Sequence, residues 1–276
     1  MSRFGARILL TFSRAAETPP ALEHSDSEGE DALERMDQIF PDFSSAIQGK
    51  AVLDFGCGAG KQAISISRRG AARVVGLDTN RNALNAARAL AGRTDPGGSV
   101  EFKDALAAED TGAFDVVISQ DAMEHYSDPE SVLKQMRAAL KPGGRLLITF
   151  GPPWLAPYGS HMQFFTAIPW VNILFSEDSV MRARSRFRDD GAMRYEDVES
   201  GLNRMTVGKF EKLLATQGLT IDFVRYDCVK GLNWLANIPR FRELFINQIT
   251  ISAKKTGHSP VEPDPGRVSS GVPDQR

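Results

Sequence analysis

Short, almost wholly apolar runs alternate along the chain with longer segments whose apolar residues recur at helical spacing. The apolar runs predict buried strands at Ala51–Phe55, Arg73–Asp78, Val100–Lys103, Phe114–Ser119 and Arg145–Phe150. The segments between them predict helices at Lys61–Arg69 and Arg81–Leu90, and a third that Asp128 caps. The glycine-containing turn at 141–144 ends this third helix. The alternation is typical of a doubly wound α/β fold, in which helices cover both faces of a mostly parallel sheet.

The alternation stops after Phe150 and resumes near Thr206. A helix is predicted over about 207–216, followed by strands at Leu219–Tyr226 and Ile249–Lys254. Since no convincing crossover helix separates these two strands, we expect them to form a hairpin-like closing pair. The segment 227–247 would be an elaborated connection between them.

Three parts of the chain are expected from its composition. Residues 15–31 are Pro-rich and then acidic, and residues 1–30 are therefore predicted to be a flexible N-terminal lead-in. Residues 31–256 form the folded domain, and residues 257–276 have the composition of a disordered tail. Within the domain, residues 152–205 are rich in aromatic side chains, which indicates an inserted lid over the site; among them are Trp154, Tyr158, Phe164, Phe165, Trp170 and Phe175. The same aromatics would also suit a helical subdomain or a homodimer interface.

Net charge, cysteine content and the length of the apolar segments indicate which partners and which cellular compartment to expect. The 276 residues have a formal net charge of −2, which gives no electrostatic reason to expect a nucleic-acid partner. Only Cys57 and Cys228 are present, so a reduced compartment is expected rather than a disulfide framework. No segment approaches the ~20 apolar residues of a membrane helix. We therefore expect a cytoplasmic protein with no membrane partner.

A glycine-rich turn follows the first predicted strand directly. Gly56, Gly58 and Gly60 alternate with small residues, and Lys61 then opens a helical pattern. Glycine permits a tight turn and lets a ligand approach the backbone closely. The helix that follows presents unpaired N–H groups to that ligand. The turn therefore indicates a site for a nucleotide-like cofactor.

The ends of the next strands carry further candidates, because ligands of such sheets bind at the carboxyl ends of the strands. Asp78 ends the second strand, where a carboxylate suits the two hydroxyls of a ribose. Its alternative role is to cap the following helix, although Thr79 or Asn80 would serve equally well. Asp104 follows the third strand, where it meets the amino group of a base or is simply a turn residue.

Taken together, these motifs resemble class I S-adenosylmethionine-dependent methyltransferases. The resemblance rests on the order and spacing of 52–60, 75–78, 102–105, 114–125 and 140–144. It implies a Rossmann-like sheet of seven strands with an antiparallel last strand, and S-adenosylmethionine as the cofactor. By position, Asp54, Gly56, Gly58 and Gly60 would hold the methionine portion, Asp78 the ribose, Asp104 and Ala105 the adenine, and Gln120 would flank the sulfonium.

Two other functions remain open on the sequence. A non-catalytic protein that binds S-adenosylmethionine as a regulator or partner would carry the same motifs. A nicotinamide-dependent oxidoreductase would have two residues between its second and third glycines, whereas one residue separates Gly58 from Gly60.

The resemblance implies in-line transfer of the methyl group to a small-molecule acceptor, for which we expect an oxygen nucleophile and no metal ion. His161 lies in the aromatic insert and is the candidate general base; its alternative is a hydrogen-bonded residue of the lid. His125, the second histidine that could act as a base, follows the fourth strand, where a structural role is expected instead.

Overall fold

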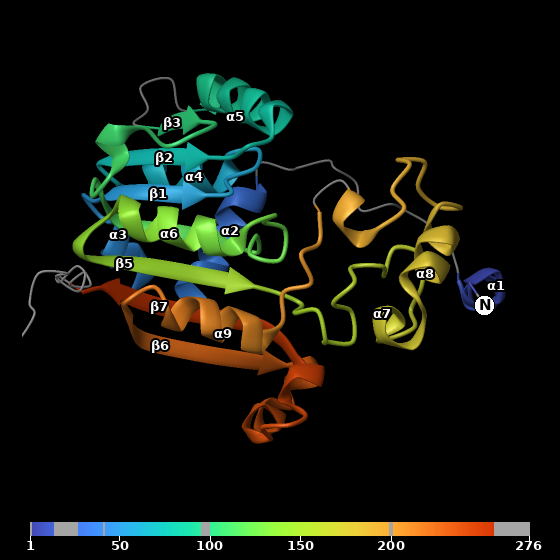
Figure 1. Ribbon diagram of the computed structural model, residues 1–276. Coiled ribbons are helices and arrows are strands. Elements are labelled where there is room, and N and C mark those ends of the chain that lie inside the picture. The colour runs from blue at the N-terminus through green and yellow to red at the C-terminus, as the bar shows by residue number, and fades with distance from the viewer. Residues whose placement is uncertain (1, 14–26, 41, 95–99, 199–200, 257–276) are drawn as a thin grey trace, which may run out of the picture.

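The computed structural model describes residues 2–13, 27–40, 42–94, 100–198 and 201–256. Its centre is a seven-stranded sheet with the order β3-β2-β1-β4-β5-β7-β6 (Figure 1). The strands are β1 (Ala51–Phe55), β2 (Arg73–Leu77), β3 (Val100–Lys103), β4 (Phe114–Gln120), β5 (Leu140–Phe150), β6 (Leu219–Cys228) and β7 (Ile246–Lys255). Neighbours among β1 to β5 are parallel, whereas β7 is antiparallel to both β5 and β6. This confirms the predicted fold class and the closing pair of strands.

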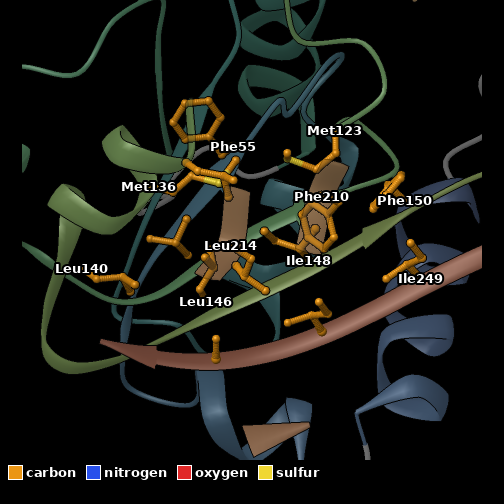
Figure 2. Packing of buried hydrophobic residues seen from close by; sticks show 14 of the residues in the cluster. Phe55, Met123, Met136, Leu140, Leu146, Ile148, Phe150, Phe210, Leu214 and Ile249 are labelled. Atoms are coloured by element: carbon orange, nitrogen blue, oxygen red, sulfur yellow. The ribbon is translucent and has the colours of Figure 1, made fainter. Parts of the chain in front are cut away.

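Helices cover both faces of the sheet, and each face has its own apolar core. One face is covered by α6 (Pro129–Ala139) and α9 (Val207–Ala215). The other is covered by α2 (Ser27–Ile39), α3 (Phe43–Ile47), α4 (Lys61–Arg68) and α5 (Arg81–Thr94). Figure 2 shows the first core, where Phe210 of α9 packs edge-on against Phe150 of β5 at 4.8 Å between ring centroids. Burial of these side chains drives the layered packing.

The junction between α6 and β5 differs from the expectation. The turn at 141–144 was predicted to separate the helix from a strand that starts at Arg145, but β5 begins at Leu140, directly after α6. Leu140 pairs with Phe114, and the next pair along the ladder is Val116 with Arg145. The turn is therefore an irregularity within the pairing of β4 with β5. The residue before the turn, Leu140, and the residue after it, Arg145, both pair with β4.

The insert after β5 forms a separate cluster at the carboxyl-end edge of the sheet (Figure 1). Its elements are α7 (Val171–Leu174), α8 (Glu177–Arg184) and a short 3-10 turn, η2 (Tyr195–Asp197). Phe165 and Tyr195 are almost completely buried here, and Tyr195 packs edge-on against Trp154 at 4.8 Å. The aromatic side chains of the insert therefore bury one another, which the sequence left as one of its alternatives.

The structure corrects the expectation of a flexible lead-in over residues 1–30. Residues Ser2–Phe12 form the helix α1, and α2 begins at Ser27. Leu9 of α1 is fully buried in the cluster of the insert, and α1 packs against α8. The stretch 14–26 between the two helices and the predicted tail 257–276 lie outside the described residues. The domain boundaries themselves remain predictions.

The connection between β6 and β7 contains three 3-10 turns, namely η3 (Val229–Gly231), η4 (Asn233–Asn237) and η5 (Arg242–Leu244). This agrees with the elaborated connection expected over 227–247. None of the described helices has the length and apolar character that crossing a bilayer requires.

Candidate active site

The glycine loop after β1 requires glycine at each of its alternate positions. Gly56, Gly58 and Gly60 have φ angles of +83°, +52° and +76°, a region that other residues adopt only with strain. The amide N–H groups of Gly56 and Cys57 both donate to the carbonyl oxygen of Leu77, at 2.8 and 3.0 Å. The loop is therefore fastened to the end of β2.

Close packing adds a second requirement at two of these positions. A Cβ at Gly60 would lie 2.6 Å from the ring of Phe102, and one at Gly56 would lie 2.7 Å from the hydroxyl of Tyr126. At Gly58, by contrast, no atom lies within 4 Å of the position that a Cβ would take. The loop is thus packed on both sides and leaves open space only at Gly58.

The carboxylate of Asp78 connects the glycine loop to the start of α5. One of its oxygens accepts the Gly58 N–H at 2.8 Å, and the other accepts the Asn80 N–H at 2.8 Å. The cap of α5 is Asn80 instead, because its side-chain oxygen accepts the N–H groups of Asn82 and Ala83 at 3.0 and 3.2 Å. The capping role that the sequence left open for Asp78 therefore belongs to Asn80.

A cavity of about 480 Å³ opens at the carboxyl ends of β1, β2 and β3. It brings together four residues that the sequence predicted for the cofactor, namely Gly56, Asp78, Asp104 and Ala105. The opposite wall comes from the segment after β4 and from α6, and includes His125, Tyr126, Val132 and Gln135. The Tyr126 hydroxyl donates to the carbonyl oxygen of Phe55 at 2.9 Å, which holds this wall against the loop. The volume lies within the usual range for small-molecule sites.

The other predicted cofactor residues lie elsewhere. Gly58 and Gly60 belong to the loop but do not line this cavity, and Asp54 is buried in β1 with 2% of its surface exposed. Burial, together with the nearby Asp78 carboxylate, raises the pKa of Asp54 to about 7. Its Oδ2 has no hydrogen-bond partner among the described residues. Gln120 lines a different cavity, of about 510 Å³, between β4 and the ends of β5 and β7.

A third cavity, of about 350 Å³, lies beside the first and contains both candidate histidines. His125 and Val198 line both cavities, so the two cavities adjoin at these residues. The rings of His125 and His161 meet edge-on at 5.4 Å between centroids. Met162, Phe164 and Leu202 of the insert provide apolar surface around them. The arrangement offers a second, partly apolar compartment next to the predicted cofactor cavity.

The two histidines are held differently. Nδ1 of His125 lies 2.8 Å from the carbonyl oxygen of Gly201, so a backbone contact fixes its ring, in agreement with the expected structural role. Nε2 of His161 has no hydrogen-bond partner among the described residues. Burial lowers the pKa of His161 to about 4, and the neighbouring His125 contributes to this shift. The imidazole of His161 is therefore neutral at pH 7.

The sequence reasoning missed two residues that join the insert to the segment after β4. The Gly151 N–H at the start of the insert donates to Glu124 Oε1 at 3.3 Å. At its end, the side-chain amide of Asn203 donates to the carbonyl oxygens of Met123 and Tyr126 at 2.7 and 2.8 Å. Both ends of the insert are thus attached to one short segment that also borders the cavity. The sequence separation of up to 80 residues hides such contacts from local patterns.

Comparison with known proteins supports the resemblance. Residues 53–148 match the model of a family described as "Methyltransferase domain". This part of the chain is therefore similar to a methyltransferase domain. The match covers the glycine loop, Asp78, Asp104 and the segment after β4, which are the residues from which the resemblance to S-adenosylmethionine-dependent methyltransferases was predicted.

Similar proteins include the ubiquinone biosynthesis O-methyltransferase of Acinetobacter baylyi, which is 37% identical over 110 residues. The match covers 38% of this chain and 45% of that protein, so the chain spans about half the length of the curated relatives it matches.

Solved structures share the fold at lower identity. A putative S-adenosylmethionine-dependent methyltransferase from Listeria monocytogenes is 19% identical with a TM-score of 0.53, covering 83% of this chain and 99% of that one. Magnesium protoporphyrin IX methyltransferase from Synechocystis PCC 6803, solved with bound SAH, is 15% identical with a TM-score of 0.53, covering 92% and 94%.

Proposed function

We propose that this protein transfers a methyl group from S-adenosylmethionine to an oxygen atom of a small-molecule acceptor. The observation that carries the proposal is the cavity at the carboxyl ends of β1, β2 and β3, where Gly56, Asp78, Asp104 and Ala105 meet. The O-methyltransferases among the relatives favour oxygen as the acceptor atom.

The residues of this cavity suit the parts of the cofactor. Asp78 would accept hydrogen bonds from the ribose hydroxyls, and Asp104 with Ala105 would border the adenine. The open space at Gly58 lets the methionine portion approach the loop backbone. Asp54 lies directly behind the loop with one carboxylate oxygen free of hydrogen bonds among the described residues. These features fit a ligand that carries hydroxyl and amino groups, and the Synechocystis neighbour was solved with SAH bound.

When bound, S-adenosylmethionine supplies an electrophilic methyl group, which an oxygen nucleophile takes by in-line displacement. The chain contributes approach geometry and exclusion of water. We place the acceptor in the cavity of about 350 Å³, because it adjoins the cofactor cavity at His125 and Val198, where the two must join for the nucleophile to reach the methyl group. His161 lines this cavity and would accept the proton of the nucleophile.

The test is methyl transfer from S-adenosylmethionine with a labelled methyl group to a panel of phenols and other hydroxylated small molecules. We expect labelled product with at least one oxygen acceptor. The substitution His161→Asn should lower turnover by about 10²–10⁴ while binding of S-adenosylhomocysteine is unchanged. Binding without transfer to any acceptor would support the non-catalytic alternative, and a small effect of His161→Asn would leave that residue a structural part of the insert.

A further inference from the structure

The segment between β6 and β7, residues 229–245, forms a compact loop that we call the 229–245 loop. Its base is closed by the Val229 N–H, which donates to the carbonyl oxygen of Phe245 at 2.9 Å. Consecutive turns inside it are hydrogen-bonded in the backbone, for example from Leu235 to Leu232 at 3.0 Å. Leu235 and Phe245 also pack against the core of the sheet. The loop is therefore a defined structure with an attached base.

Three large apolar side chains of this loop face solvent. Leu232, Trp234 and Phe241 are 44%, 61% and 55% exposed, and they lie within ten residues of one another in the sequence. None of them lines a cavity described above. Clusters of exposed aromatic residues of this kind mark interaction surfaces.

The charges beside these side chains are basic. Lys230 and Arg240 are exposed and form no ion pair with any described residue. The remaining charged residues of the loop are engaged, since Arg242 pairs with Glu211, and Glu243 accepts the Gly208 N–H at 3.1 Å. The charged side chains of the loop that have no ion-pair partner among the described residues are therefore both positive.

The loop lies at the same edge of the sheet as the candidate active site (Figure 1). β5 and β6 both run antiparallel to β7, so the insert after β5 and the loop after β6 leave the sheet at the same end. Phe245 at the base of the loop packs edge-on against Trp170, which precedes α7, at 6.4 Å between centroids. Ile173 and Leu174 of the nearby α7 are also exposed, at 47% and 64%.

We propose that the protein docks peripherally on an anionic lipid surface through the 229–245 loop. Tryptophan with apolar neighbours and free Lys or Arg residues is the composition of membrane-interface segments, in which the rings enter the headgroup layer and the cations meet the phosphates. No membrane partner was predicted from the sequence, because no segment is long enough to span a bilayer. Peripheral docking needs no such segment, and it goes beyond the proposed function.

The test is co-sedimentation of the full chain with vesicles of phosphatidylcholine mixed with phosphatidylglycerol, and with vesicles of phosphatidylcholine alone. We expect binding to the mixed vesicles that weakens as salt is added. The double variant Trp234→Ser, Phe241→Ser should bind about 100-fold more weakly or worse, since burial of each ring contributes about tenfold or more. The variant Lys230→Gln, Arg240→Gln should bind about 25-fold more weakly, at about fivefold per charge.

The matched control is Ile221→Ser, Val224→Ser, which removes two apolar side chains that are 47% and 43% exposed on β6, away from the loop. It should bind vesicles like the unchanged protein. No binding to the mixed vesicles, or equal binding by the Trp234 and Phe241 variant, would overturn the proposal. A dimer in solution that this variant converts to a monomer would assign the surface to a second copy of the chain instead. Vesicle binding needs no turnover, so its failure would leave the proposed function untouched.

Discussion

The sequence left two roles open among the neighbouring polar residues Asp78, Thr79 and Asn80: contact with the ribose of the cofactor, and the cap of the helix that follows. All three have side-chain oxygens near the start of α5, and local preference alone does not separate them. The structure gives the cap to Asn80 and turns the Asp78 carboxylate toward the glycine loop and the cavity. Asp78 differs from Asn80 because its carboxylate accepts the N–H of Gly58 in the glycine loop, which lies 20 residues earlier in the chain.

Substitution of these two residues should therefore have separate effects. Asp78→Asn should weaken binding of S-adenosylhomocysteine by about 1–3 kcal/mol, because hydrogen bonds to the ribose are lost. Asn80→Ala should lower the free energy of unfolding by about 1 kcal/mol, because α5 loses its cap, with little change in binding. Calorimetric titration and urea unfolding of both variants measure the two effects. Equal affinity of Asp78→Asn and the unchanged protein would remove Asp78 from the cofactor site.

Glu124 is a buried carboxyl group whose charge opposes folding. Burial raises its pKa from 4.5 to about 8, so the folded protein binds its proton more tightly than the unfolded chain does. Between these two values the folded state holds more protons, and the contribution of Glu124 to stability falls as pH rises.

The substitution Glu124→Gln should remove this dependence. We expect the free energy of unfolding of the variant, relative to the unchanged protein, to rise by about 1–3 kcal/mol between about pH 5 and about pH 8. Urea unfolding at a series of pH values measures it. Glu130→Gln, on the exposed start of α6, is the control and should follow the unchanged protein. If the free energy of unfolding varied with pH in the same way for Glu124→Gln and the unchanged protein, the carboxyl group of Glu124 would not be buried as described.

At the scale of elements, the strands of the sheet were predictable to within a few residues. Strands such as β1 and β2 are short apolar runs that are almost wholly buried, and such runs have few other stable positions, whereas β6 at the edge of the sheet is largely exposed. The sequence missed α1, whose apolar face is buried only because α8 of the insert lies against it. It also placed the start of β5 too late, since the pairing of Leu140 with Phe114 depends on a neighbouring strand. Both errors concern contacts between distant segments.

The glycine loop allows a direct comparison of close packing with backbone strain. Gly58→Ala should cost about 1–2 kcal/mol, because only its positive φ disfavours a side chain. Gly60→Ala should cost about 1–3 kcal/mol more, because its Cβ would overlap the ring of Phe102. Urea unfolding of the two variants measures the difference. Similar losses in both would mean that Phe102 moves aside readily.

The attachment of the insert to the segment after β4 predicts an effect on both stability and activity. Asn203→Ala loses two hydrogen bonds to backbone carbonyls and should cost about 1–3 kcal/mol of unfolding free energy. Because this segment borders both cavities, kcat/KM should fall as well. Asn172→Ala, which loses one bond to Trp154 inside the insert, is the matched control and should leave kcat/KM nearly unchanged. Equal kcat/KM for both variants would argue against the role of the Asn203 contacts.

At the scale of the whole molecule, the sheet order places three strand ends around one cavity and the insert beside it. The sequence motifs identified four residues of that cavity, because glycine turns and acidic strand ends are local signals. They did not reveal that Gln120 lines another cavity, or that His125 lines both the cofactor cavity and the one that contains His161. Those relations depend on how the segment after β4 folds back, which no local spacing encodes.

The central claim is that this cavity holds S-adenosylmethionine, and calorimetric titration with S-adenosylhomocysteine tests it most directly. NAD serves as the control ligand, because the nicotinamide-dependent alternative would use the same edge of the sheet. We predict one site per chain with a Kd of about a micromolar or below for S-adenosylhomocysteine, and no heat of binding for NAD. Absence of binding by S-adenosylhomocysteine, or binding of NAD instead, would contradict the claim.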